Sequence, residues 1–284
     1  MKDPTPEFSF ELFPPKTAEG MEKLKKQVLK LHTVGPEYFS VTYGAGGSTR
    51  EGTVETVSWL VGQQIETAPH LTCIGASRQE TRDLLGHYRE QGIRRVVALR
   101  GDLPSGMGGR PGGDFRYAND LVAFIRAEHG EHFRIEVAAY PEFHPQAPSA
   151  ERDLENFARK VEAGADVAVT QYFYNADAYF HFVDSCQARG IEVPIVAGIM
   201  PITNYTQLAR FSSTCGAEIP RWIGKKLEGY GDDLTSLRAF GHEVVLNLCR
   251  QLLDGGAPGI HFYTMNQAGP TLRLWEELGL QSNR

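Results

Sequence analysis

The sequence predicts an α/β fold of the (β/α)8 barrel class, a TIM barrel, with extra helices between the seventh and eighth strands. Eight short apolar runs alternate with longer amphipathic, charged segments along the chain. An unbroken series of strands that are each followed by a helix is typical of a parallel barrel. The length of 284 residues, of which 41% are hydrophobic, suits one large barrel with a sizeable core. We therefore expect residues 1–284 to form a single domain.

The strands are expected where apolar residues dominate, and the helices where apolar residues recur with helical spacing. The expected strands are residues 8–13, 38–43, 69–74, 96–100, 135–140, 167–173, 195–199 and 259–263. The expected helices are residues 17–32, 50–64, 77–91, 116–129, 150–163, 175–189, 203–213 and 268–278. The interval 200–258 contains two further expected helices, 218–229 and 233–254, which we interpret as an insertion packed on the barrel.

Turn and cap residues support these boundaries. Pro14 and Pro15 end the first expected strand, because proline cannot donate a ladder hydrogen bond. Ser149 and Asn175 precede two helices as N-cap residues. Gly130 and its counterparts at the ends of other helices tolerate the left-handed conformation that ends a helix.

An acidic residue, Glu11, interrupts the apolar first strand, Phe8-Ser9-Phe10-Glu11-Leu12-Phe13. Burying an ionised carboxylate without a partner costs several kcal/mol. Glu11 is therefore either paired with a structural partner or kept as a proton donor, and both interpretations stay open at this point.

Composition excludes several classes of function. The net charge of −6, without a strongly basic block, argues against nucleic acid or an anionic membrane surface as the main partner. The sequence contains no run of about eighteen apolar residues, so no membrane span is predicted. The first residues also lack the apolar core of a signal peptide. The four cysteines form no C-x-x-C pair, which indicates reduced core thiols. We expect a soluble, cytoplasmic protein without a metal site.

Polar residues gather at the expected C-terminal ends of the strands. They include Glu11, Thr42, Tyr43, His70, Arg100, Asp102, Tyr140, His144 and Gln171. Active sites of such barrels are built at that end. Each residue alone has a structural explanation, since His70 could be a core histidine and Arg100 with Asp102 a surface ion pair. Their convergence at one mouth of the barrel favours a functional site.

A second polar group lies on the expected helix 150–163. Asp153, Asn156 and Lys160 follow each other at i, i+3 and i+7, which places them on one helical face beside Arg159. This face is either solvated or binds a long ligand that carries phosphates.

The glycine turn at residues 44–47 does not have the G-x-G-x-x-G spacing of a dinucleotide fingerprint. Serine-hydrolase and metal-ligand motifs are likewise absent from the sequence.

Seven motifs in order carry a resemblance to a known family. They are Ser9-Phe10-Glu11-Leu12-Phe13-Pro14-Pro15-Lys16, Ser40-Val41-Thr42-Tyr43-Gly44-Ala45, Pro69-His70-Leu71-Thr72-Cys73, Ala98-Leu99-Arg100-Gly101-Asp102, Ala138-Ala139-Tyr140-Pro141-Glu142-Phe143-His144-Pro145, Thr170-Gln171-Tyr172-Phe173 and His261-Phe262-Tyr263-Thr264-Met265-Asn266. The chain resembles the bacterial, FAD-containing 5,10-methylenetetrahydrofolate reductases from about residue 7 to residue 278. The length leaves no room for the C-terminal regulatory domain of the eukaryotic enzymes.

The resemblance implies FAD as cofactor and a ping-pong reaction at one site. NADH or NADPH reduces the flavin and leaves, and methylenetetrahydrofolate then becomes 5-methyltetrahydrofolate, the methyl donor for methionine synthesis. Glu11 is implied as the general acid, and Asp102 as a charge between flavin and pterin. Gln171 is implied as a contact of both substrates, Gln207 as a folate contact, and Phe211 as the ring under the nicotinamide. The family also commonly forms homo-oligomers.

The resemblance also implies a set of FAD contacts. They are Thr42, Tyr43, Ala45, His70, Arg100, Gly101, Asp102, Tyr117, Ala118, Tyr140, His144, Ala147, Asp153, Asn156, Arg159 and Lys160. One substrate position departs from the family, because Gln267 stands where a basic residue commonly reaches the glutamate tail of folate. An amide lacks the charge-assisted part of that hydrogen bond.

Two other functions remain open from the sequence. Another FAD barrel oxidoreductase, similar to proline dehydrogenase, would bind the flavin and ignore folate. A non-catalytic module that binds folate or flavin would not need an acid at the position of Glu11.

Overall fold

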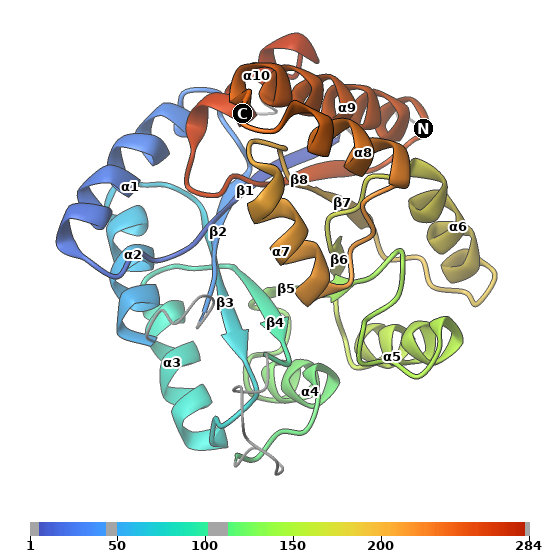
Figure 1. Ribbon diagram of the computed structural model, residues 1–284. Helices are drawn as coiled ribbons and strands as arrows, with labels where there is room; N and C mark the ends of the chain where they lie inside the picture. Colours follow the sequence, from blue (N-terminus) through green and yellow to red (C-terminus); the bar gives the residue numbers. More distant parts are fainter. Residues whose placement is uncertain (1–5, 44–49, 102–112, 282–284) are drawn as a thin grey trace.

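The strands form a closed barrel in which β1 to β8 follow each other in sequence order, and every neighbouring pair is parallel (Figure 1). The computed structural model describes residues 6–43, 50–101 and 113–281. The strands are β1 (Glu7–Leu12), β2 (Tyr38–Val41), β3 (Thr67–Thr72), β4 (Arg95–Leu99), β5 (Arg134–Ala139), β6 (Val167–Thr170), β7 (Ile195–Ile199) and β8 (Gly259–Tyr263). The predicted TIM barrel is therefore confirmed.

Helices surround the strands and alternate with them along the chain (Figure 1). They are α1 (Ala18–His32), α2 (Arg50–Gly62), α3 (Arg78–Glu90), α4 (Ala118–His129), α5 (Ala150–Glu162), α6 (Ala176–Gln187), α7 (Tyr205–Cys215), α8 (Arg221–Tyr230), α9 (Leu234–Asp254) and α10 (Ala268–Glu277). None of these described helices is both long and apolar enough to cross a lipid bilayer.

Several strands end earlier than the sequence predicts. Strand β2 ends at Val41 instead of residue 43, and β6 ends at Thr170 instead of residue 173. Aromatic residues follow each strand within two or three positions, but the regular strand stops before them. Gln171 makes a last hydrogen bond from its backbone N to Ala139 O at 2.8 Å. Ladder pairing decides these boundaries, and pairing depends on neighbouring strands that local sequence does not show.

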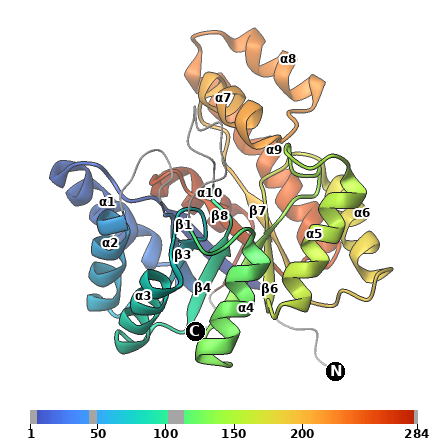
Figure 2. The same cartoon turned by 90° about the horizontal axis from the view of Figure 1, so that it is seen from below.

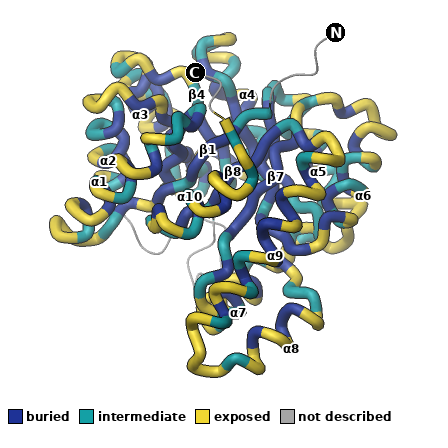
Figure 3. Tube along the Cα trace, turned by 90° about the horizontal axis from the view of Figure 1, so that it is seen from above, coloured by how far each residue is buried: buried dark blue, intermediate teal, exposed yellow. Residues whose placement is uncertain are grey.

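The predicted insertion is present as α7, α8 and α9, although only part of it packs on the barrel. Helix α9 packs against α6, α10 and β7. Helices α7 and α8 project beyond one end of the barrel (Figure 2), and many of their residues are exposed (Figure 3). Because α7 follows the C-terminal end of β7, this projection stands on the rim where active sites of such barrels lie.

Alternation along β1 explains how the site is separated from the core. Phe8, Phe10 and Leu12 are buried, and Phe8 and Phe10 pack on Trp275 of α10 with ring centroids 5.3 and 5.7 Å apart. Because side chains alternate across a strand, Ser9 and Glu11 face the inside of the barrel. The apolar face therefore holds the helices, and the polar face is left for the interior and the rim.

Candidate active site

Glu11 lies at the C-terminal end of β1, next to two buried histidines. Its Oε2 atom is 3.6 Å from His70 Nε2 and 3.8 Å from His261 Nε2, and its side chain is 21% exposed. Within the described residues, the charged or ionisable neighbours within 4 Å of the Glu11 carboxyl group are these two histidines. No described lysine or arginine neutralises this carboxyl group, which argues against a purely structural ion pair.

His70 does not act as that missing cation. Burial lowers its pKa to about 4, because the low-dielectric surroundings disfavour the imidazolium, and the nearby Glu11 only partly offsets this effect. His70 is therefore neutral at pH 7 and offers a hydrogen-bonding ring to the carboxyl group. The sequence left open whether His70 is a core histidine, and the structure places it in the core with one ring nitrogen facing the site.

Residues that follow β8 hold the end of β1 in place. Thr264 Oγ1 donates a hydrogen bond to Glu11 O at 2.6 Å. The Asn266 side chain accepts from Phe13 N at 3.1 Å and donates to Phe13 O at 2.8 Å. The pair of hydrogen bonds from Asn266 and the bond from Thr264 fix the backbone on both sides of Leu12. The segment after the neighbouring strand therefore sets the direction of the Glu11 side chain.

The loop between β5 and α5 forms the next part of the rim. The Tyr140 and His144 rings meet edge to face with centroids 4.7 Å apart. Asp153 Oδ2 accepts a hydrogen bond from His144 N at 2.9 Å, and Ala147 N donates to His144 O at 2.8 Å. Helix α5 and this loop are thus one hydrogen-bonded unit.

The predicted polar face of α5 divides in the structure. Lys160 is half-buried, and its Nζ donates to Ala138 O of β5 at 2.5 Å. Burial lowers its pKa to about 8, and Asp153 opposes this shift only in part. Arg159 is instead 56% exposed and donates to Asn156 Oδ1 at 2.9 Å. The solvated interpretation therefore describes Arg159 and Asn156, while ligand binding by Lys160 stays a prediction.

Other predicted residues lie at the same rim on several elements. Thr42 and Tyr43 follow β2, Arg100 and Gly101 follow β4, Tyr117 and Ala118 begin α4, and Gln171 follows β6. Arg100 Nη2 donates to Gln146 Oε1 at 2.5 Å, so Arg100 is directed toward the loop after β5. Ala45 and Asp102 lie outside the described residues, so the proposed pairing of Arg100 with Asp102 stays a prediction.

The remaining predicted residues lie on α7 and before α10. Gln207 and Phe211 are one helical turn apart on α7 and are both exposed, which places them on neighbouring positions of one face. Gln267 is the exposed N-cap residue of α10, directly after the segment that clamps β1. A small cavity at the rim is lined by Tyr140 and Gln171 together with Cys215 from the end of α7.

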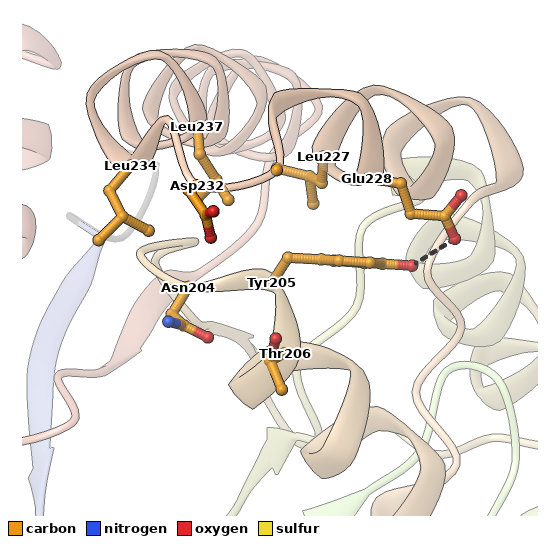
Figure 4. Close-up of a pocket in the computed structure, with 9 residues that line it drawn as sticks. Asn204, Tyr205, Thr206, Leu227, Glu228, Asp232, Leu234 and Leu237 are labelled. Atoms are coloured by element: carbon orange, nitrogen blue, oxygen red, sulfur yellow. Dashed lines mark hydrogen bonds between the residues drawn. The ribbon is translucent and has the colours of Figure 1, made fainter.

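A larger cavity, of about 400 Å³, lies elsewhere, between α7, α8 and α9 (Figure 4). Tyr205 crosses it and donates to Glu228 Oε1 at 3.2 Å. None of the predicted site residues lines it, and its wall residues belong to the insertion. We therefore assign the active site to the barrel rim and not to this cavity.

Sequence reasoning missed several residues around Glu11. His261 lies beside the carboxyl group inside the barrel, and Ser9 and Ser40 face the two ring nitrogens of His261. The clamp of Asn266 was not expected either. A usable signal was present for Ser9 and His261. Ser9 has the same strand parity as Glu11, and His261 is a polar residue in the middle of an apolar strand.

The rim of this parallel eight-stranded barrel gathers an acid without a described cationic partner, the neutral His70, amides and a half-buried lysine. This combination defines a TIM-barrel enzyme. The family described as methylenetetrahydrofolate reductase matches residues 1–279. The chain therefore belongs to the methylenetetrahydrofolate reductase family, a family of oxidoreductases.

Individual relatives agree with this membership. A "5,10-methylenetetrahydrofolate reductase" from Pectobacterium carotovorum is 41% identical over 96% of this chain and 90% of its own length. A "Probable methylenetetrahydrofolate reductase (NADH)" from Oryza sativa is 39% identical over 96% of this chain, which spans 48% of that protein. A solved structure from Clostridium thermocellum has a TM-score of 0.69 at 16% identity and covers 97% and 96% of the two chains. That protein binds two copies of 5-methyl-5,6,7,8-tetrahydrofolic acid, and the likeness itself supports the fold.

Proposed function

We propose that this chain reduces 5,10-methylenetetrahydrofolate to 5-methyltetrahydrofolate, with NADH or NADPH as electron donor and FAD as cofactor at one ping-pong site. The observation that carries the proposal is Glu11, a rim carboxyl group beside two histidines and without a described cationic partner. Such a group can hold a proton and deliver it to a substrate. We further propose that the chain folds as a single domain and forms a homo-oligomer in the cytoplasm. Its product would supply methyl groups for methionine synthesis.

Three features of the described residues fit FAD. Lys160 has a partly buried ammonium group whose partner is a backbone carbonyl. Thr42 Oγ1 is buried and has no hydrogen-bond partner within the described part of the chain. Tyr117 exposes 59% of its surface at the start of α4. Phosphates suit the ammonium, and flavin or adenine rings suit the unused hydroxyl and the exposed aromatic ring. When bound, FAD supplies the two-electron carrier between the two substrates.

The chain's own residues perform the remaining tasks in this proposal. Glu11 gives a proton to the folate nitrogen that leaves as the five-membered ring opens, and its carboxylate then takes a proton from water. Gln171, at the end of β6, contacts both substrates in turn. Gln207 contacts folate, and Phe211 packs on the nicotinamide from the exposed face of α7. Asp102 steadies the cationic folate intermediate.

Anaerobic mixing experiments test this function against its alternatives. The purified protein should be yellow or take up FAD, NADH should bleach the flavin, and methylenetetrahydrofolate should restore its colour. A protein that cannot be reconstituted with FAD would contradict the proposal. Bleaching by proline, without reoxidation by methylenetetrahydrofolate, would instead indicate a relative of proline dehydrogenase.

We expect FAD binding to weaken with rising pH because of Lys160. Its pKa is about 8 in the free protein, and a bound pyrophosphate would raise this value by stabilising the ammonium group. Binding between these two pKa values then takes up a proton, so the dissociation constant rises with pH. The linkage predicts about tenfold weaker binding at pH 9 than at pH 7. Quenching of FAD fluorescence on titration measures this change.

Two variants separate Lys160 from other titrating groups. Lys160→Met should bind FAD more weakly at pH 7 and should lose the pH dependence. Lys225→Met removes an exposed lysine of α8 and should keep the wild-type profile. An unchanged pH profile in Lys160→Met would show that Lys160 does not face the phosphates.

Gln267→Arg is expected to improve the binding of folates that carry several glutamates. The exposed N-cap position can present a guanidinium to the tail carboxylates, and exposed ion pairs contribute up to about 1 kcal/mol, or roughly fivefold in KM. The gain should disappear at high salt, because screening removes it. Gln251→Arg, on the exposed face of α9, is the control and should have no effect on KM. An equal gain in both variants would indicate general charge attraction.

A further inference from the structure

The Tyr172 hydroxyl connects the end of β6 to helix α7. Its oxygen shares a hydrogen bond with Ser212 Oγ at 3.1 Å and accepts one from Cys215 Sγ at 3.4 Å. The residue is 5% exposed, so water competes little for these bonds. Its ring packs edge to face on Tyr263 of β8, with centroids 6.3 Å apart. Tyr172 is thus held in the barrel by its ring and bonded to the insertion by its hydroxyl, and it has no role in the proposed reaction so far.

Helix α7 depends on such an anchor because it buries little of its own surface. The whole helix lies in the described part of the chain, and its buried side chains are Leu208 and Ser212. It projects beyond the rim together with α8 (Figure 2). The hydrogen bond from Tyr205 to Glu228 joins α7 to α8 within the insertion and not to the barrel. An element with few buried apolar side chains opens more easily than the core, so each bond to the barrel contributes to its position.

The C-terminal end of α7 is where the helix meets the rim. Gly216 ends the helix in a left-handed conformation with φ of 78°, and an added Cβ atom there would lie 3.0 Å from Pro145 of the loop after β5. Two residues further on, Glu218 N donates to Glu142 Oε2 of the same loop at 2.7 Å. The Tyr172 bonds therefore hold the helix at the end that already touches the barrel.

Both bonded residues stand next to residues that the proposed function assigns to substrates. Gln171 directly precedes Tyr172 at the end of β6. Phe211 directly precedes Ser212 and forms, with Gln207, an exposed face of α7 that we call the substrate face. The small rim cavity described above lies at this junction. The hydrogen bond between Tyr172 and Ser212 therefore sets how far the substrate face stands from Gln171.

We propose that Tyr172 is a positioning residue that holds α7 over the rim, so that Gln171 and the substrate face contact the same ligand from two sides. Without this anchor, a ligand that touches both would have to order α7 when it binds, and such ordering weakens binding. NADH and methylenetetrahydrofolate occupy the site in turn, so the same hydroxyl serves both half-reactions. This inference rests on the proposed function, which assigns Gln171 and the substrate face to the two substrates.

Tyr172→Phe removes the hydroxyl and keeps the ring that packs on Tyr263. In the FAD-loaded protein, anaerobic half-reactions should give dissociation constants for NADH and for methylenetetrahydrofolate that are both about fivefold higher than in the wild type. This fold-change corresponds to a net hydrogen-bond contribution of about 1 kcal/mol. The limiting rates at saturating substrate should stay within about twofold of the wild type, because the bound ligand restores the position of α7. FAD affinity should not change, since no predicted FAD contact lies on α7.

Two further variants test whether the hydrogen bond itself is responsible. Ser212→Ala removes the partner on α7 and should raise the same two dissociation constants. The double variant should bind no more weakly than Tyr172→Phe alone, because that substitution already breaks the bond. Tyr179→Phe is the matched control, since this buried tyrosine donates to Ile195 O at 2.7 Å, at the end of β7 away from the rim. It should change neither dissociation constant.

Cys215 provides a readout that does not depend on the reaction. The other three cysteines are buried, whereas Cys215 is half-buried and bonded to Tyr172. Labelling of Cys215 by dithionitrobenzoate should be about fivefold faster in Tyr172→Phe than in the wild type, because the opening equilibrium of the helix end shifts by that factor. Cys215→Ser assigns the signal by its loss, and Tyr179→Phe should keep the wild-type rate.

The outcomes are distinguishable. Unchanged labelling or unchanged dissociation constants in Tyr172→Phe would overturn the proposal, and so would additive effects of Tyr172→Phe and Ser212→Ala. Weaker binding of only one substrate, or an equal loss of FAD affinity, would also overturn it, because the anchor acts on both substrates and not on the cofactor. A wild-type protein that does not react with methylenetetrahydrofolate would refute the proposed function, and thiol labelling would still test the anchor separately.

Discussion

Glu11→Gln is expected to leave the reduction of bound FAD by NAD(P)H intact and to slow flavin reoxidation by methylenetetrahydrofolate by about 10²-fold or more. The amide has nearly the same size as the carboxyl group and can still face His70 and His261. It cannot deliver an acidic proton, so the folate ring opens without assistance. Hydride uptake from the nicotinamide needs no such proton. Anaerobic stopped-flow spectroscopy at the flavin absorbance measures the two steps separately.

A second rim carboxyl group provides the control. Glu142 Oε2 accepts a hydrogen bond from Glu218 N at 2.7 Å, and the side-chain oxygen of a glutamine can accept the same bond. Glu142→Gln should therefore leave both half-reactions close to the wild type. Equal slowing of both half-reactions in Glu11→Gln would show that Glu11 shapes the site and does not deliver the proton.

Gly198→Ala is expected to destabilise the barrel by about 3 kcal/mol, the upper end of the usual range for overpacking. A Cβ atom at this position of β7 would lie 2.0 Å from Thr170 O and 2.7 Å from Tyr263 Cε2. The first neighbour is backbone, so strands β6 and β7 would have to separate. Tyr263 also donates to Thr170 O at 2.7 Å, and its ring lies against His261, so the site would be displaced as well. Urea denaturation measures the loss.

Gly86→Ala is the matched control for that substitution. Gly86 lies inside α3, and an added Cβ would meet nothing within 4 Å. Replacing a glycine in a helix by alanine should raise the free energy of unfolding by about 0.5–1 kcal/mol. A loss of less than about 1 kcal/mol in Gly198→Ala, beside a gain in Gly86→Ala, would mean that β6 and β7 adapt more easily than close packing allows.

The structure also shows where sequence patterns stop being informative. Helical spacing placed Asp153, Asn156 and Lys160 on one face of α5, but it did not show that Lys160 turns inward to Ala138 O while Arg159 is exposed. A long side chain at the edge of a helical face can extend into solvent or toward the barrel. The position of the neighbouring strand decides which of the two it does. In the same way, local sequence predicted the helices of the insertion, but not that α7 and α8 project beyond the rim (Figure 2).

The sequence by itself determined the barrel class, the order of strands and helices, the family, and the position of Glu11 at the end of the first strand. These features follow from periodic patterns and motifs, which are properties of neighbouring residues along the chain. Only the tertiary structure decided what surrounds that acid. His261 of β8 lies beside Ser9 and Glu11 of β1 because the barrel closes β8 onto β1. Tyr38 of β2 likewise meets Glu136 of β5 only across the closed interior. Hydrogen-bond direction and burial in that interior depend on closure, which no local pattern encodes.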